Sequence, residues 1–425
     1  MKIFFCLLLT YFSIGFSFSQ NIDKIINATE VSRIETILSS DKMEGRKTFT
    51  PSIDLAADFI ANEFKKSGLQ YFDGLKSYKQ RFSMLKSTLI SVSGHTNGQS
   101  IEPEHIVAIS TDENLKFDEN SGFTKVIIDS GANLFKEAYG LLKENKKYLV
   151  LVNNSFATNF MRLKRFNRES FEAKAPVVFV LTNENPATYR FEIKNEITSS
   201  SLANVIGVLP GKSRKDEYVI FSAHYDHLGI GKPDAKGDSV YNGANDDAAG
   251  TTAVIMLAHY FSKLKNNDRT LIFVTFTAEE IGGFGSQYFS AQINTEKAIA
   301  MFNIEMIGTD SKWGNNSAYI TGYEKSDFGK ILQSNLEGSN FHFEPDPYPE
   351  QNLFYRSDNA TLAALGVPAH TISTSKMDNE PNYHKQSDEI PTLDINNMAE
   401  IIKAIAISSK TIVSGKDTPA RVEKR

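Results

Sequence analysis

From about position 201 onward, short apolar segments alternate with longer segments of helical length. The longer segments, 248–264 and 393–413, carry apolar residues at helical spacing. Strands that alternate with helices favour a mostly parallel, doubly wound sheet covered by helices on both faces. We therefore predict an α/β fold here. The predicted strands, rich in β-branched and aromatic residues, are 203–209, 218–223, 271–277, 299–303 and 367–373.

The chain before position 201 shows two other patterns. Residues 53–67 repeat apolar side chains at helical spacing and Gly68 follows as a C-cap, which predicts an amphipathic helix. From about Tyr78 to Ser201, short apolar runs alternate with polar turns, as is typical of β-structure. We expect a main domain from 20–77 and 202–415, a β-rich inserted lobe at 78–201 and a frayed polar tail at 416–425.

The first residues have the composition of a secretory signal peptide. Lys2 precedes an apolar run from Ile3 to Phe16, and small residues follow at Ser17 and Ser19. The run is shorter than the ~20 apolar residues that a membrane-spanning helix needs. We therefore expect cleavage of residues 1–19, export to the periplasm or secretion, and no stable membrane insertion afterwards.

Charge and cysteine content limit the possible partners and the chemistry. The chain has 51 acidic and 46 basic residues, a net charge of −5, so it lacks the basic excess typical of nucleic-acid binding. Its only cysteine, Cys6, lies in the expected signal peptide. A metal ion in the mature protein would therefore have His, Asp and Glu ligands.

Polar residues follow the predicted strands where doubly wound sheets bind their ligands, beyond the carboxyl ends. His224 and Asp226 come directly after the strand 218–223. Residues two apart in an extended chain face the same way. Asp226 is therefore expected to orient His224, as second carboxylates often do for metal-binding histidines.

Two further acidic groups occupy comparable positions. Asp246 lies in the loop before the helix 248–264, where an aspartate is more often an N-cap than a ligand. Glu279 and Glu280 follow the strand 271–277. Adjacent glutamates usually mark a solvated surface, but these two end an apolar strand, which weakens that interpretation.

Glu305 ends the next predicted strand, and His384 lies in the polar loop 382–388. With His224, Asp246 and Glu280 they form a set of two histidines and three carboxylates. Such nitrogen and oxygen ligands suit a pair of zinc ions. The five residues together indicate a zinc site more specifically than any one of them does alone.

In their order along the chain, these motifs resemble the two-zinc aminopeptidase family, metallopeptidase family 28. That family includes bacterial leucyl and streptomycete aminopeptidases, glutamate carboxypeptidases and glutaminyl cyclases. The resemblance covers about 200–415 and the opening from Val31 to Leu69 with its Met43-Glu-Gly-Arg46. Its motifs are His224-Tyr-Asp226, Gly243-Ala-Asn-Asp246-Asp-Ala-Ala-Gly250, Glu279-Glu280-Ile-Gly-Gly-Phe-Gly-Ser286, Asn303-Ile-Glu305-Met306 and Tyr383-His384.

The resemblance implies that Asp246 bridges two Zn²⁺ ions and that the peptide bond after it is cis. Glu280 and His384 would complete one zinc site, and His224 and Glu305 the other. Glu305 departs from the aspartate that the family usually has at this position.

The resemblance also implies that Glu279 is the general base and that Tyr383 is a candidate to stabilise the oxyanion, with ordinary packing an equal alternative for the tyrosine. The expected activity is an aminopeptidase acting on peptides. A carboxypeptidase or a glutaminyl cyclase on the same metal frame is the second possibility, and a non-catalytic binding protein the third. Side-chain specificity and oligomeric state stay open at this stage.

Overall fold

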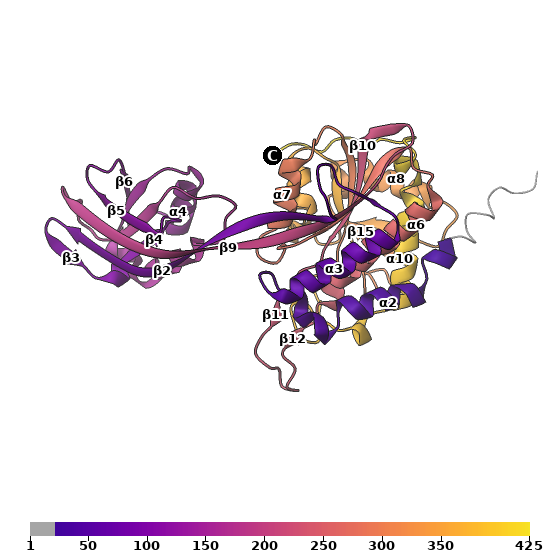
Figure 1. Ribbon diagram of the computed structural model, residues 1–425, viewed down its shortest axis with the longest axis horizontal. Helices are drawn as coiled ribbons and strands as arrows, with labels where there is room; N and C mark the ends of the chain where they lie inside the picture. Colours follow the sequence, from indigo (N-terminus) through magenta and orange to yellow (C-terminus); the bar gives the residue numbers. More distant parts are fainter. Residues whose placement is uncertain (1–21) are drawn as a thin grey trace, which may run out of the picture. The chain divides into compact units, whose positions relative to one another are not determined.

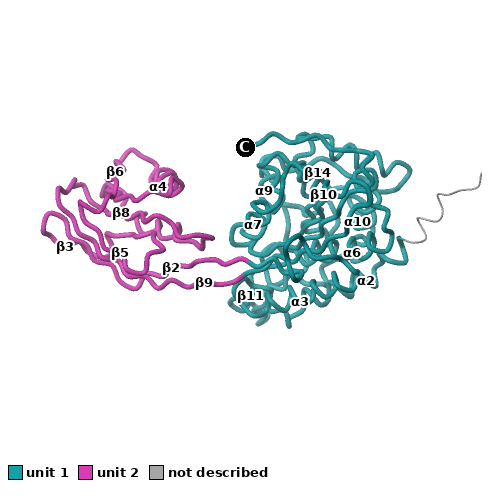
Figure 2. The backbone as a smooth tube through the Cα atoms, turned by 45° about the horizontal axis from the view of Figure 1, so that its top comes forward, with its two compact units in different colours: residues 1–81, 202–425 teal, residues 82–201 magenta. Residues whose placement is uncertain are grey.

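The computed structural model describes residues 22–425, so the expected signal peptide at 1–19 lies outside the described residues. The chain forms two compact units (Figure 2). One combines the residues up to 81 with 202–425, and the other comprises 82–201. The second unit thus begins at Phe82, whereas the sequence pattern placed the start of the inserted lobe at Tyr78.

The first unit is built around a mostly parallel sheet, which confirms the predicted fold class (Figure 1). Its four central strands are parallel: β10 (Arg214–His224), β13 (Arg269–Phe276), β14 (Ala298–Ile304) and β17 (Ala369–Ser373). At one side β9 (Tyr189–Leu209) runs antiparallel to β13, and β1 (Gln70–Tyr71) pairs with β9. At the other side lie β15 (Ser317–Ile320) and β16 (His342–Pro345).

Helices cover both faces of this sheet because successive strand residues point to opposite sides. Phe221 belongs to the core cluster on one face and its neighbour Ile220 to the cluster on the other. The first cluster is closed by α2 (Ala28–Leu38), α3 (Pro51–Lys66), α6 (Ala249–Leu264), α8 (Phe328–Asn335) and α10 (Ile395–Ser408). The second is closed by α7 (Phe284–Gln292) and α9 (Asn359–Ala364).

The second unit has its own sheet and its own core. The strands are β4 (Ile106–Ile109), β8 (Val177–Leu181), β7 (Tyr148–Val152) and β6 (Thr124–Ile128), in this order across the sheet. Val150 and Leu149 point into two separate apolar clusters, one of which includes α4 (Leu134–Lys143). The long strands β2 (Lys79–Thr96) and β9, with β3 (Gln99–Ile101) and β5 (Asn114–Asp118), complete the unit.

The C-terminal segment 416–425 packs against the first unit, so the expectation of a frayed tail was wrong. Val422 is buried in the same apolar cluster as α7 and α9. The guanidinium group of Arg421 donates to the carbonyl oxygen of Ala298 at 2.7 Å. The buried Arg269 donates to the carbonyl oxygen of Asp417 at 2.6 Å. These contacts join residues that are far apart in the sequence.

Within residues 22–425, every helix is too short or too polar to cross a membrane.

Candidate metal centre

The carboxyl ends of the parallel strands meet at one edge of the sheet, and the predicted site residues lie there. His224 is the last residue of β10, and Glu305 directly follows β14. Glu279 and Glu280 lie in the turn between β13 and α7. His384 belongs to the loop that follows β17. Strands far apart in the sequence thus bring these side chains together.

Asp246 and Asp247 are joined by a cis peptide bond at the start of the segment that leads into α6. The carboxylate of Asp388 accepts the backbone N–H groups of Asn245 and Asp246, at 2.8 and 3.0 Å. Asp247 accepts the N–H of Gly250 in the first turn of α6 at 3.0 Å. The helix-capping function considered for Asp246 therefore falls to Asp247, and the side chain of Asp246 points to the ligand candidates.

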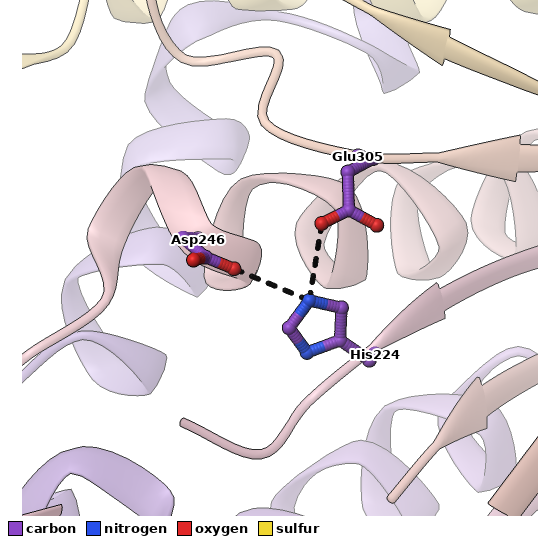
Figure 3. A group of neighbouring side chains, drawn as sticks. All are labelled: His224, Asp246 and Glu305. Carbon is purple, nitrogen blue, oxygen red and sulfur yellow. Dashed lines mark hydrogen bonds and ion pairs between the residues drawn. The ribbon is translucent and has the colours of Figure 1, made fainter. Parts of the chain in front are cut away.

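The two carboxylate oxygens of Asp246 face two different groups of side chains. Oδ1 lies 3.2 Å from Nε2 of His224, which in turn lies 3.2 Å from Oε1 of Glu305 (Figure 3). Oδ2 lies 3.2 Å from Nε2 of His384, which lies 3.2 Å from Oε2 of Glu280. A carboxylate shared in this way has the arrangement needed to bridge two cations.

His227 also belongs to this centre, although it was not among the candidate ligands identified in the sequence. Its Nδ1 atom lies 2.7 Å from Oε1 of Glu280 and 4.0 Å from Oδ2 of Asp246. His227, Asp246 and Glu280 form one buried group of suitable metal-ligand atoms, and His224, Asp246 and Glu305 form another. One sequence feature could have indicated that His227 belongs to the site: it lies three residues after His224, beyond the end of the same strand.

Asp226 supports the centre differently from the expectation. Its carboxylate accepts the backbone N–H groups of Glu279 and Glu280, at 3.1 and 3.4 Å. Nδ1 of His224 is 3.1 Å from the carbonyl oxygen of Asp226 but 3.7 Å from its carboxylate. The aspartate side chain therefore positions the two glutamates, and the main chain of the same residue is the closer partner of the imidazole.

Glu305 is fixed by a short chain of hydrogen bonds behind it. The hydroxyl group of Ser357 donates to Oε2 of Glu305, which leaves Oε1 on the side of His224. The side-chain amide of Asn303 donates to the same hydroxyl group at 2.7 Å. Asn303 also accepts a hydrogen bond from Ser222 at 2.8 Å. These hydrogen bonds hold the side chain of Glu305, which is longer than the aspartate usual in the family, in one orientation.

The carboxylates of the centre create an environment that favours bound cations. The carboxylates of Asp246 and Glu280 raise the pKa of His384 to about 10, which shows how strongly this cluster favours positive charge. Burial raises the pKa of the Glu279 carboxyl well above its ordinary value, and the nearby Glu305 adds to the shift. Among the described residues, Oε1 of Glu280 and both ring nitrogens of His227 are buried without hydrogen-bond partners. Histidine and carboxylate ligands with unsatisfied buried atoms suit zinc.

Residues 204–408, which carry this centre, match the sequence profile of peptidase family M28. This part of the chain belongs to peptidase family M28. Aminopeptidase YwaD of Bacillus subtilis is 20% identical over 302 residues, which cover 67% of this chain and 59% of the relative. The chain therefore spans less than two thirds of that protein.

Solved structures share the M28 fold at low sequence identity. An aminopeptidase from Aneurinibacillus sp. strain AM-1 is 19% identical with a TM-score of 0.55, over 95% of this chain and 97% of that one. A glutaminyl cyclase from Porphyromonas gingivalis is 12% identical with a TM-score of 0.50, over 92% and 99% of the two chains. At such identities the likeness shows the fold, and function has to be argued from the site.

The M28 centre of this chain opens beside Glu305 into a cavity of about 60 Å³. The ring of Tyr383 stacks on that of His384, with 3.9 Å between centroids. Burial raises the pKa of Tyr383, so its hydroxyl group stays protonated at neutral pH. The cavity wall includes Met306, Tyr319, Leu353, Arg356 and Tyr383.

Proposed function

We propose that this protein is an exported M28 aminopeptidase that uses two zinc ions to remove N-terminal residues from peptides. The observation that carries the proposal is the division of the two Asp246 oxygens between two ligand groups. His224 and Glu305 would complete one zinc site, and Glu280 and His384 the other. Export is supported by the signal-peptide composition of residues 1–19.

Two zinc ions would polarise the peptide carbonyl group and make a water molecule more acidic. Glu279 is suited to the proton transfer because it follows β13 beside both ligand groups but belongs to neither. Asp226 holds the backbone of Glu279 at 3.1 Å. The raised pKa of Glu279 allows its carboxyl group to keep a proton until the leaving amine accepts it.

The substrate side chain would enter the cavity beside Glu305, where Met306, Leu353 and Tyr383 provide an apolar wall. The protonated hydroxyl group of Tyr383 is a candidate donor to the developing oxyanion. One observation favours the carboxypeptidase alternative. Arg356 lines the same cavity and is exposed, and a guanidinium group there suits a substrate carboxylate.

A mixed peptide library, followed by mass spectrometry, separates these possibilities. Stepwise shortening of the peptides from the N-terminus supports the proposed aminopeptidase activity. If a chelator abolishes this shortening and added zinc restores it, the activity depends on zinc. Shortening from the C-terminus would establish the carboxypeptidase instead, and cyclised N-terminal glutamine the cyclase. Full hydrolysis by a demonstrably metal-free sample would contradict the mechanism.

A further inference from the structure

We propose that one face of the inserted unit 82–201 docks the protein on the surface of a membrane that contains anionic phospholipids. The face is formed by α4 and by η4 (Met161–Phe166), which pack against each other. Its exposed side chains, which we call the basic face, are Tyr139, Lys143, Met161, Arg162, Lys164 and Arg165. The peptidase activity proposed above gives this face no function, because every residue of the metal centre belongs to the first unit.

The first reason is an uneven distribution of charge within the unit. Residues 134–168 contain eight basic and two acidic residues, whereas the rest of the unit contains six basic and twelve acidic residues. Within residues 22–425, Lys146 is the only one of those eight basic residues that pairs with a carboxylate, that of Glu144 at 2.9 Å. The four cations of the basic face are therefore not neutralised by the protein itself, and such a surface attracts an anionic partner.

The second reason is that two guanidinium groups share one aromatic ring. Arg162 and Arg165 both lie over the ring of Phe135, with 5.4 and 5.2 Å between Cζ and the ring centroid. The ring attracts each cation, but the two like charges repel one another. An anion bound between them would relieve this repulsion, and a guanidinium group can donate two parallel hydrogen bonds to a phosphate group. The pair therefore fits the phosphate of a lipid headgroup.

The third reason is that apolar side chains are exposed among these cations. Tyr139 is 51% exposed and Met161 is 37% exposed. The ring of Phe166 lies 6.3 Å from that of Tyr139 and 6.4 Å from that of Phe135, between centroids, so the three rings form one group. Basic side chains beside aromatic and other apolar ones are typical of surfaces that bind in the headgroup region of a bilayer. An acidic polymer in water would engage the charges and leave these apolar side chains without a partner, so the observations favour a membrane.

The basic face is also held in shape by the core beneath it. Leu134 and Ala138 of α4 and Leu163 of η4 are buried in one apolar cluster of this unit. These residues anchor both segments to the sheet, so the exposed side chains of the two segments keep a common arrangement. A preformed surface loses little conformational entropy when it binds.

Sedimentation with lipid vesicles tests the proposal, using protein without residues 1–19 because their apolar run would itself bind lipid. We expect binding to vesicles of phosphatidylglycerol and phosphatidylcholine in equal parts, weakening as salt is added, and no binding to phosphatidylcholine alone. The double variant Arg162→Gln, Arg165→Gln should lower the affinity on the order of tenfold or more, because each basic side chain at an anionic surface favours binding. The double variant Lys212→Gln, Lys263→Gln removes two exposed cations from the first unit and is the matched control.

A second double variant, Tyr139→Ser with Met161→Ser, tests the apolar contribution. It should also lower the affinity for the anionic vesicles on the order of tenfold, because it removes the apolar surface that the bilayer would cover. Ile90→Ser, which changes an exposed apolar residue of β2 in the same unit, is its control and should bind like the parent. All variants should keep the circular dichroism of the parent, so that a loss of binding is not a loss of folding.

Dextran sulfate distinguishes a membrane from an acidic polymer. Parent protein that binds dextran sulfate but not the anionic vesicles would overturn the proposal in favour of an acidic polymer. So would vesicle binding that depends on the two arginines but is unchanged in the Tyr139→Ser, Met161→Ser variant. Parent protein that binds neither partner, or control variants that lose as much affinity as the variants of the basic face, would overturn it outright.

Discussion

Glu279 and Glu280 are neighbours in the sequence, but the structure gives their side chains different surroundings. Glu280 contacts both His227 and His384, whereas Glu279 belongs to neither ligand group. Glu279→Gln should therefore keep two zinc ions and lose at least ~10²-fold in kcat, because it removes only the proton acceptor. Glu280→Ala should lose metal. Metal analysis and steady-state kinetics on both variants check this, and a Glu279→Gln variant that loses zinc would contradict the assigned roles.

Glu305 allows a second prediction at the same scale. Because its Oε1 atom lies 3.2 Å from His224 and its Oε2 atom is held by Ser357, Glu305→Ala should bind one zinc ion where the parent binds two. Ser357→Ala should keep both ions but bind one more weakly, since it only frees the side chain of Glu305. Equal stoichiometry in Glu305→Ala and the parent, measured by titration of the metal-free protein, would show that Glu305 is not a ligand.

At the scale of elements, one buried carboxyl group links α2 to α6. Glu35 is fully buried and accepts a hydrogen bond from the hydroxyl group of Thr252 at 2.8 Å. Burial raises the pKa of Glu35 to about 8 from an ordinary value of 4.5. The folded state therefore keeps the proton over a pH range in which the unfolded state has lost it.

Stability from this protonation is complete below pH 4.5 and is lost as the pH rises towards 8. The loss approaches roughly 1.4 kcal/mol per pH unit within this window. Urea unfolding at pH 5 and pH 8 should show a larger loss for the parent than for Glu35→Gln. Glu337→Gln, which changes an exposed glutamate, is the control and should behave like the parent. An equal loss in the parent and Glu35→Gln would show that Glu35 is ionised in the folded state.

The elements that sequence could predict are those with a strong local pattern. β13, β14 and the second half of β10 are buried on both faces, so these stretches are mostly apolar and their positions were predicted within a few residues. The short edge strands β15 and β16 carry no such pattern and were not predicted. The predicted helix at 393–413 is interrupted, because α10 ends at Ser408 and α11 (Lys410–Val413) follows.

The candidate site was predictable to a similar degree and for a related reason. The rule that ligands gather at the carboxyl ends of strands predicted that His224, Glu280 and Glu305 would lie together, and the structure brings them together. The same rule applies to His227, three residues after His224, but this histidine was not among the candidate ligands identified in the sequence. The packing of Glu280 and Gly243 around the ring reveals its position.

At the scale of the whole molecule, the inserted unit 82–201 should be removable. The segments that flank it are adjacent in the sheet, since the N–H of Ile206 donates to the carbonyl oxygen of Tyr78 at 2.7 Å. Each unit also has its own apolar core. A chain in which a short turn joins Arg81 to Leu202 should fold and bind two zinc ions. Circular dichroism and metal analysis test this, and loss of both structure and zinc would show that the first unit depends on the insertion.

The contacts of Arg269 affect the order in which the chain can fold. This buried arginine in β13 donates to the carbonyl oxygens of Ile412 and Asp417, at 2.8 and 2.6 Å, and to the hydroxyl group of Thr418. Those acceptors leave the ribosome long after β13 does. Until then Glu217 can pair with Nε at 2.6 Å, but the other two nitrogens of the guanidinium group have to stay hydrated, which opposes closure of the core around them. The first unit can therefore complete its core only after the last residues of the chain have been synthesised.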